Sequence, residues 1–148
     1  IPKLLGVDGR KMSKSYDNFI ALGDSEKTIK EKCAMMFTDP KRIKLSDKGH
    51  ADECNLYHYF NLLDKKKAPK VYEYCTNAKK GCAECKKDLA GVVADYLSDI
   101  RKKREKLLKD KAALRDILKQ GAKKARKAAA ETMSEVRKIT GLTQQNEK

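Results

Sequence analysis

The first residues that could do chemistry lie in segment 6–18, which reads GVDGRKMSKSYDN. Three cations, Arg10, Lys11 and Lys14, occur there with a single apolar residue, Met12, among them. Such a stretch cannot bury an amphipathic face, so the sequence predicts a glycine-flanked loop rather than a helix or strand. Lysine is a compact cation with three donors, and the phosphate chain of a nucleotide needs such groups from several directions. We therefore expect this loop to hold an anion.

Four of the five cysteines form a second group that could bind a metal, because Cys54, Cys75, Cys82 and Cys85 follow the pattern C-x20-C-x6-C-x2-C. Four thiolates suit either a tetrahedral zinc ion or a [4Fe–4S] cluster, and free thiols are the remaining alternative. An odd number of cysteines fits a secreted disulfide framework poorly and predicts a reducing cytoplasm. Cys33 falls on an apolar helix face and is expected in the core.

The composition limits the kinds of partner that the cationic loop and the cysteines could bind. The chain has 148 residues, of which 40% are hydrophobic and 38% charged, with a formal net charge of +14. This balance favours a large polyanionic partner, above all nucleic acid, over a merely solvated lysine-rich surface. No apolar run approaches the roughly 20 residues of a membrane span, and no signal-peptide pattern is present. A chain that opens with Ile1-Pro2 directly before a dense motif is expected to be a piece of a longer one.

Helices must position both groups, since the sequence has helical periodicity from Asp24 onward and no strand-like alternation beyond the first few residues. The expected helices cover 24–37, 53–63, 71–76, 85–108 and 111–140, and Gly141 is expected to end the last one. Residues 40–50 are predicted to be a loop. Two apolar faces are predicted, one from Leu89, Val93, Tyr96, Leu97, Ile100 and Leu107, and one from Leu114, Leu118, Ala122, Ala125, Ala129, Met133 and Val136.

The string Arg10 to Ser15, preceded by Asp8-Gly9 and followed by Asn18, resembles the KMSKS signature of class I aminoacyl-tRNA synthetases. The resemblance implies a loop at the edge of a Rossmann-type catalytic domain that binds the triphosphate of ATP, with its Mg²⁺, and stabilises the transition state of amino-acid activation. Carried over by position, Lys11 and Lys14 are the catalytic phosphate ligands, while Met12, Ser13 and Ser15 shape the ATP site. Asp17 stands where relatives often carry glycine, and we expect it to face solvent.

The cysteine region narrows this resemblance, because residues 81–87 are similar to a stretch of some bacterial tryptophanyl-tRNA synthetases. The resemblance implies that Cys54, Cys75, Cys82 and Cys85 hold a [4Fe–4S] cluster, as the corresponding cysteines do in those proteins. The cluster would have a structural or RNA-contacting role. Residues 38–40, 99–101, 121–126 and 136–142 also resemble the family, so the likeness extends along essentially the whole chain. The position at which the chain ends favours tryptophan over tyrosine as the amino-acid substrate, since bacterial tyrosyl-tRNA synthetases usually continue into a further RNA-binding domain.

A basic helical surface completes the set of candidate sites. It comprises Lys102, Lys103, Arg104, Lys119, Lys123, Lys124, Arg126 and Lys127. Such cations contact phosphates and carry little sequence information. The resemblance singles out Lys123 and Arg126 as tRNA-binding residues. His50 and His58 are isolated and are expected to be surface or core residues rather than ligands.

These observations predict a mainly α chain: residues 1–23 as the end of a catalytic domain with its KMSKS loop, and 24–148 as a helical anticodon-binding domain. The function that the resemblance implies is ATP-dependent ligation of tryptophan to tRNA(Trp). The chain alone is expected to be inactive, because it lacks the family's HIGH motif and amino-acid pocket, and the full-length protein is expected to pair as a homodimer through the missing half. The alternatives are a tyrosyl-tRNA synthetase fragment and a non-enzymatic, metal-containing or Fe–S-containing RNA-binding module.

Overall fold

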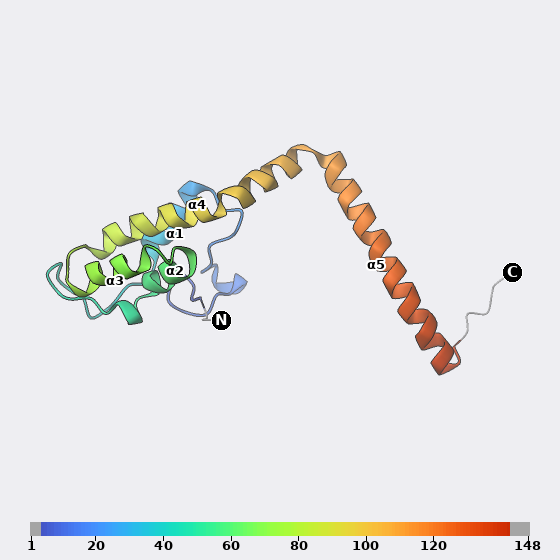
Figure 1. Ribbon diagram of the computed structural model, residues 1–148, viewed down its shortest axis with the longest axis horizontal. Coiled ribbons are helices and arrows are strands. Elements are labelled where there is room, and N and C mark those ends of the chain that lie inside the picture. The colour runs from blue at the N-terminus through green and yellow to red at the C-terminus, as the bar shows by residue number, and fades with distance from the viewer. Residues whose placement is uncertain (1–3, 143–148) are drawn as a thin grey trace. The chain divides into compact units, whose positions relative to one another are not determined.

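The computed structural model describes residues 4–142 and confirms a mainly α-helical chain (Figure 1). The elements are η1 (Lys14–Tyr16), α1 (Glu26–Met35), η2 (Ala51–Glu53), α2 (Asn55–Leu63), α3 (Ala68–Thr76), α4 (Cys82–Lys109) and α5 (Lys111–Thr140). Between residues 4 and 142, strand-like pairing is confined to an isolated antiparallel bridge from Leu5 to Lys11. The outermost positions of the two predicted domains, 1–3 and 143–148, lie outside the described residues.

The helix ends follow local chemistry. Ser25 caps α1, because its hydroxyl accepts a hydrogen bond of 3.1 Å from the Thr28 N–H. Helix α3 begins at Ala68 rather than at the expected Val71, with Pro69 in its first turn. Proline suits that position, because the first turn needs no N–H for the helical hydrogen bonds. The long helix α4 likewise begins three residues early, at Cys82 instead of Cys85.

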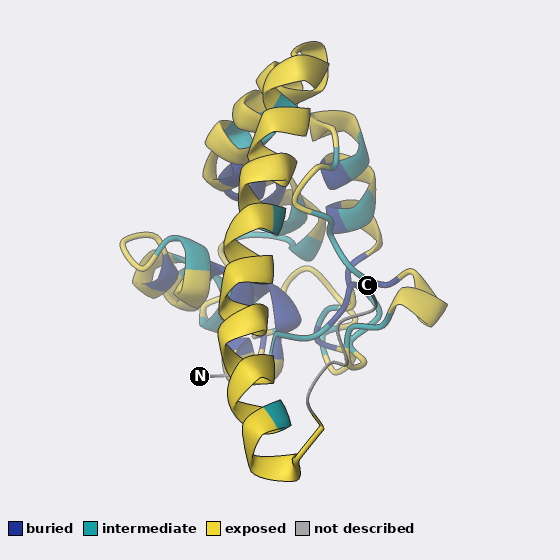
Figure 2. Cartoon of the chain, turned by 90° about the vertical axis from the view of Figure 1, so that its right-hand side faces the viewer, coloured by how far each residue is buried: buried dark blue, intermediate teal, exposed yellow. Residues whose placement is uncertain are grey.

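The described residues up to Lys103 form one compact unit whose core is built by α1, α2 and α4. Its largest fully buried side chains are Phe60, Ile29, Met36, Leu56, Leu89 and Cys33. Figure 2 colours all buried parts of the described chain dark blue. Val7, at the base of the cationic loop, belongs to the same core. The helices therefore pack directly beneath the loop, and Cys33 is a core residue as predicted.

Helices α1 and α4 run antiparallel across this unit. The Lys86 ammonium, early in α4, donates a 3.0 Å hydrogen bond to the carbonyl of Ala34, near the end of α1. Late in α4, the Arg101 guanidinium lies 3.2 Å from the carboxylate of Glu26, the first residue of α1. These polar contacts at both ends fix the sliding position of one helix against the other.

Lys32 ties the chain between the loop and α1 to that helix. Its ammonium donates hydrogen bonds of 2.8 Å to the Phe19 carbonyl and 2.9 Å to the Asp24 carboxylate. The Phe19 ring also lies 5.1 Å from the same ammonium, within reach of a cation–π interaction. The segment that leaves the loop is thus held by a largely buried cation.

The predicted apolar face of α4 is only partly correct. Leu89, Val93 and Leu97 are buried, whereas Tyr96, Ile100 and Leu107 are 60%, 39% and 38% exposed. Beyond Leu97 no residue of α4 joins the buried core of this unit, and Leu107 already belongs to the second.

The described residues from Arg104 onward form the second unit, which contains α5. The apolar face predicted for residues 111–140 is present in the sequence pattern, but α5 has no buried residue. Gly141 ends the helix with φ of +69°, the left-handed conformation that glycine adopts readily. None of the described helices combines the length and apolarity that crossing a membrane would require.

Replacing Phe60 by alanine tests the assignment of the core. Phe60 is 0% exposed, so F60A should lower the free energy of unfolding by about 3–5 kcal/mol. The matched control is L45A, because Leu45 is 72% exposed and its truncation should change stability by less than about 0.5 kcal/mol. Urea unfolding followed by circular dichroism measures both, and equal effects of the two variants would contradict this core.

Candidate phosphate-binding loop and thiol pocket

The cationic segment is a closed loop whose two ends are hydrogen-bonded at the backbone. The Gly6 N–H donates to the Arg10 carbonyl at 2.7 Å, and the Gly9 N–H returns to the Gly6 carbonyl at 3.0 Å. At the base, the Val7 N–H donates to the Asn18 carbonyl at 2.8 Å. The loop is therefore positioned by its own main chain before any ligand arrives.

Asn18 organises the inside of this loop. Its side chain accepts a 2.8 Å hydrogen bond from the Ser13 N–H and donates to the Asp8 carboxylate at 2.8 Å and to the Lys11 carbonyl at 3.1 Å. The residue is 2% exposed, and a Cβ on Gly6 would meet it at 2.5 Å. The sequence shows only that Asn18 follows the motif and does not predict that its side chain is buried. Its burial, which carries the structural role, is a tertiary property.

The three cations of the loop have different environments. Arg10 is engaged within the loop, since its guanidinium lies 2.7 Å from the Asp8 carboxylate and 4.5 Å from the centre of the Tyr16 ring. Lys11 and Lys14 are exposed, and within residues 4–142 neither ammonium group has a hydrogen-bond or ion-pair partner. The loop thus presents these two lysines, and not the arginine, to an incoming anion.

Asp8 remains ionised in this setting. The backbone N–H of Arg10 and the side-chain amide of Asn18 lower the pKa of the Asp8 carboxyl from 3.8 to about 2. The carboxylate neutralises Arg10 while it accepts from the amide, so the net positive charge that remains on the loop is carried by the lysines. Asp8 is therefore a structural part of the cationic loop.

The remaining motif residues shape the backbone. Met12 packs against the core, and the Ser13 hydroxyl caps η1 by accepting a hydrogen bond of 3.2 Å from the Ser15 N–H. Asp17 is exposed and has φ of +46°, a left-handed conformation in which glycine is unstrained and aspartate is tolerated. A glycine at position 17 would adopt this conformation without strain.

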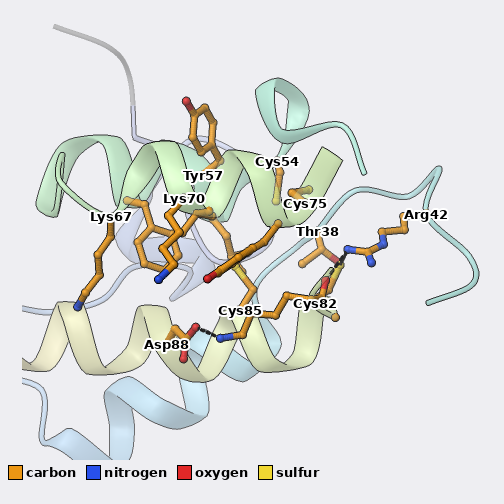
Figure 3. A pocket seen from close by; sticks show the side chains of 16 residues that line it. Thr38, Arg42, Cys54, Tyr57, Lys67, Lys70, Cys75, Cys82, Cys85 and Asp88 are labelled. Atoms are coloured by element: carbon orange, nitrogen blue, oxygen red, sulfur yellow. Dashed lines mark hydrogen bonds and ion pairs between the residues drawn. The ribbon is translucent and has the colours of Figure 1, made fainter. Parts of the chain in front are cut away.

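The four cysteines of the predicted site line one pocket of about 390 Å³ (Figure 3). Cys54 precedes the first turn of α2, Cys75 lies near the end of α3, and Cys82 and Cys85 lie in the first turn of α4. Gly49 approaches Cys75 so closely that an added Cβ would collide with its sulfur. Residues far apart in the sequence therefore bring four sulfur atoms to one cavity.

The surroundings of these thiols combine burial with hydrogen-bond donors. Burial raises the pKa of Cys54, while the backbone N–H groups of Tyr57 and Leu56 at the start of α2 act in the opposite direction. Burial also raises the pKa of Cys85 to about 12. The Arg42 guanidinium lies 4.0 Å from the sulfur of Cys82. Without a metal, burial therefore keeps Cys85 protonated; a bound cation would favour thiolates, and N–H donors are in place for them.

The thiols do not converge on a single point. Among residues 4–142, no three His, Cys, Asp or Glu side chains lie close enough together to hold one metal ion. All five cysteines are free thiols. The arrangement is thus a pocket lined by four separated sulfur atoms and not a preformed tetrahedral site.

The other predicted contacts lie outside both sites. Lys123 and Arg126 are exposed on α5. His58 is exposed, and His50 is engaged with buried Asp39, whose carboxylate lies 2.8 Å from the His50 Nδ1. Both histidines are therefore exposed, and His50 also pairs with Asp39.

The carboxyl of Asp8 offers a direct test of the loop geometry. Because its pKa is lowered to about 2, the ionised form and its contacts should persist above that pH and be lost as the pH falls through it. In N18A the midpoint should rise toward 3.8, since one donor to the carboxylate is removed. Carbon-13 NMR of the side-chain carboxyl measures the midpoint.

The control for this titration is N77A, because Asn77 caps α3 and has no contact with Asp8. Its Asp8 midpoint should equal that of the unaltered chain. A midpoint near 3.8 in the unaltered chain would contradict the loop described above.

Comparisons with known proteins relate this geometry to a family. A family model described as "tRNA synthetases class I (W and Y)" matches residues 1–98. A tryptophan–tRNA ligase of Thermotoga maritima is 41% identical over 96% of this chain and 44% of its own length. One of Aquifex aeolicus is 36% identical over 95% of this chain and 36% of its length.

Solved structures agree with the sequence comparisons. The crystal structure of the Campylobacter jejuni tryptophanyl-tRNA synthetase complexed with ADP and tryptophan matches with a TM-score of 0.84 and 33% identity, over 96% of this chain and 44% of that one. The chain thus spans less than half the length of these relatives. On the matched residues and the shared fold, the chain belongs to the class I tRNA synthetases of the tryptophan and tyrosine group.

Proposed function

We propose that this chain is the phosphate-binding and tRNA-binding part of an enzyme that activates tryptophan with ATP and transfers it to tRNA(Trp). The observation that carries the proposal is the loop, in which Asn18 holds the backbone from inside while Lys11 and Lys14 are exposed and have no partner among residues 4–142. The relatives named above, 36–41% identical, are tryptophan–tRNA ligases, which supports tryptophan over tyrosine. Because the chain spans under half of their length, the activity belongs to the full-length protein.

In this proposal Lys11 and Lys14 bind the triphosphate of ATP, whose charge is also neutralised by Mg²⁺. Their ammonium groups stabilise the charge that develops as the α-phosphate is attacked and pyrophosphate departs. A contact that strengthens only in the transition state raises the rate and not merely the affinity. Met12, Ser13 and Ser15 shape the ATP site without supplying charge.

The proposed domain division follows from these roles. Residues 1–23 are the end of the catalytic domain, and residues 24–148 are the helical tRNA-binding domain with the cysteines. In the latter, Lys123 and Arg126 contact tRNA phosphates, because both are exposed cations on α5. The five free thiols suit the cytoplasm, and dimerisation, as the family resemblance implies, would use the half of the protein that this chain does not span.

For the thiol pocket we propose a [4Fe–4S] cluster held by Cys54, Cys75, Cys82 and Cys85. A cluster distributes its ligands over four iron atoms, so its thiolates need not converge on one point as they must around zinc. The pocket of about 390 Å³, lined by all four cysteines, and the N–H donors at Cys54 support this proposal. When bound, it would cross-link α2, α3 and α4, which is a structural contribution and not a step of the reaction.

Substitution of Lys14 tests the catalytic proposal. In the full-length protein, K14A should lower tryptophan-dependent pyrophosphate exchange by about 10²–10³-fold, because one preorganised charge contact with the transition state is lost. The control is K44A, another exposed lysine whose side chain lies outside the loop, and it should leave the rate unchanged.

Two results would overturn the catalytic proposal. Exchange at the unaltered rate in K14A would remove the catalytic role of Lys14, and absence of exchange in the unaltered full-length protein would favour a non-enzymatic RNA-binding module. Exchange that depends on tyrosine and not on tryptophan would reassign the substrate within the same family.

Metal content tests the cluster. Anaerobically purified protein should be brown and contain about four irons per chain, and C75S should lose both the colour and most of the iron. The matched control, C33S, should keep them, because Cys33 lies in the core away from the pocket. A colourless protein with about one zinc per chain would replace the cluster by a zinc site.

A further inference from the structure

Helix α2 contacts the backbone of the phosphate-binding loop at two points. The Tyr59 hydroxyl donates a 2.8 Å hydrogen bond to the Leu5 carbonyl, and the Asn55 side-chain amide donates a 2.9 Å hydrogen bond to the Gly6 carbonyl. Four residues separate the two donors, so they lie one turn apart on the same face of α2. The carbonyls of the consecutive residues Leu5 and Gly6 are thus held by consecutive turns of α2.

Both contacts are buried. Asn55 is 2% exposed and Tyr59 is 3% exposed, so water cannot replace either donor without a rearrangement. Burial also raises the pKa of Tyr59 to about 12, which keeps its hydroxyl protonated and able to donate. These are permanent attachments in the folded protein.

The attached carbonyls lie beside the lysine that would meet the phosphates. Leu5 forms the antiparallel bridge with Lys11, and Gly6 exchanges backbone hydrogen bonds with Arg10 and Gly9 inside the loop. A shift of Leu5 and Gly6 is therefore passed directly to Lys11. Contacts that stabilise a transition state depend steeply on position, and a displacement of about 1 Å can cost about 10² in rate.

We propose that Asn55 and Tyr59 are positioning residues that set the placement of Lys11 relative to ATP. This inference rests on the proposed role of the loop in ATP binding. It assigns the alignment of a catalytic-domain element to a helix of the tRNA-binding domain. The same helix begins immediately after Cys54, so the thiol pocket and the loop are linked through α2.

The variant Y59F removes one hydrogen bond and leaves the buried ring in place. In the full-length protein, kcat for tryptophan-dependent pyrophosphate exchange should fall about three- to tenfold, as expected for one neutral hydrogen bond. The KM for tryptophan should not change, because the lysine acts on the phosphates. The control Y72F, on α3, removes a hydroxyl that lies 3.5 Å from Asp52 on the surface and should behave as the unaltered enzyme.

A double-mutant cycle separates positioning from a general structural effect. If Tyr59 acts through Lys11, then Y59F should have almost no further effect on kcat in a K11A background. The concentration of active sites is measured by titrating tryptophanyl-adenylate formation, and each rate is divided by that concentration. A variant that folds less completely therefore does not give a falsely low kcat. Equal losses in both backgrounds would overturn the proposal.

Amide hydrogen exchange tests the attachment in the 148-residue chain itself. The N–H groups of Gly6 and Gly9 should exchange about three- to tenfold faster in Y59F and in N55A than in Y72F. Unchanged exchange in both variants would contradict the attachment. If the unaltered full-length enzyme activated no amino acid, the proposed function would fail while this measurement still judged the contact between α2 and the loop.

Discussion

The cationic loop keeps the ammonium groups of Lys11 and Lys14 exposed while hydrogen bonds hold its backbone in one conformation. In this chain, the buried side-chain amide of Asn18 holds the loop backbone. Asn18 bonds to Asp8, Lys11 and Ser13 from the inside of the loop, so the ammonium groups of Lys11 and Lys14 are not used to hold the backbone. Glycine is required at position 6 because this amide occupies the space that a Cβ would need.

The distribution of charge within the loop follows from that arrangement. Asp8 could have cancelled any of the three cations, but its carboxylate lies against Arg10, which also covers the Tyr16 ring. Guanidinium suits such a role, because its planar fork bonds to a carboxylate and stacks on an aromatic ring at the same time. The compact ammonium groups of Lys11 and Lys14 are left exposed to solvent.

The helices serve both candidate sites at once. Helix α2 starts beside Cys54 at the thiol pocket, buries Phe60 in the core, and meets the loop backbone through Asn55 and Tyr59. A helix transmits a displacement along its length because its hydrogen-bonded backbone is stiff. The two sites, distant in sequence, are therefore connected by a single rigid element instead of by a chain of surface contacts.

The sequence by itself determined the helical class, most of the helix limits, the KMSKS motif and the cysteine spacing, because these depend on local propensity and on residue types at fixed intervals. It could not determine that Asn18 is buried, that Arg10 rather than a lysine pairs with Asp8, or that Asn55 and Tyr59 reach the loop. It also extended the apolar face of α4 to Tyr96, Ile100 and Leu107, where the core does not follow. Burial and long-range hydrogen bonds depend on which elements pack together. For Arg10, Asn18, Asn55 and Tyr59, only the tertiary structure decided which elements lie next to them.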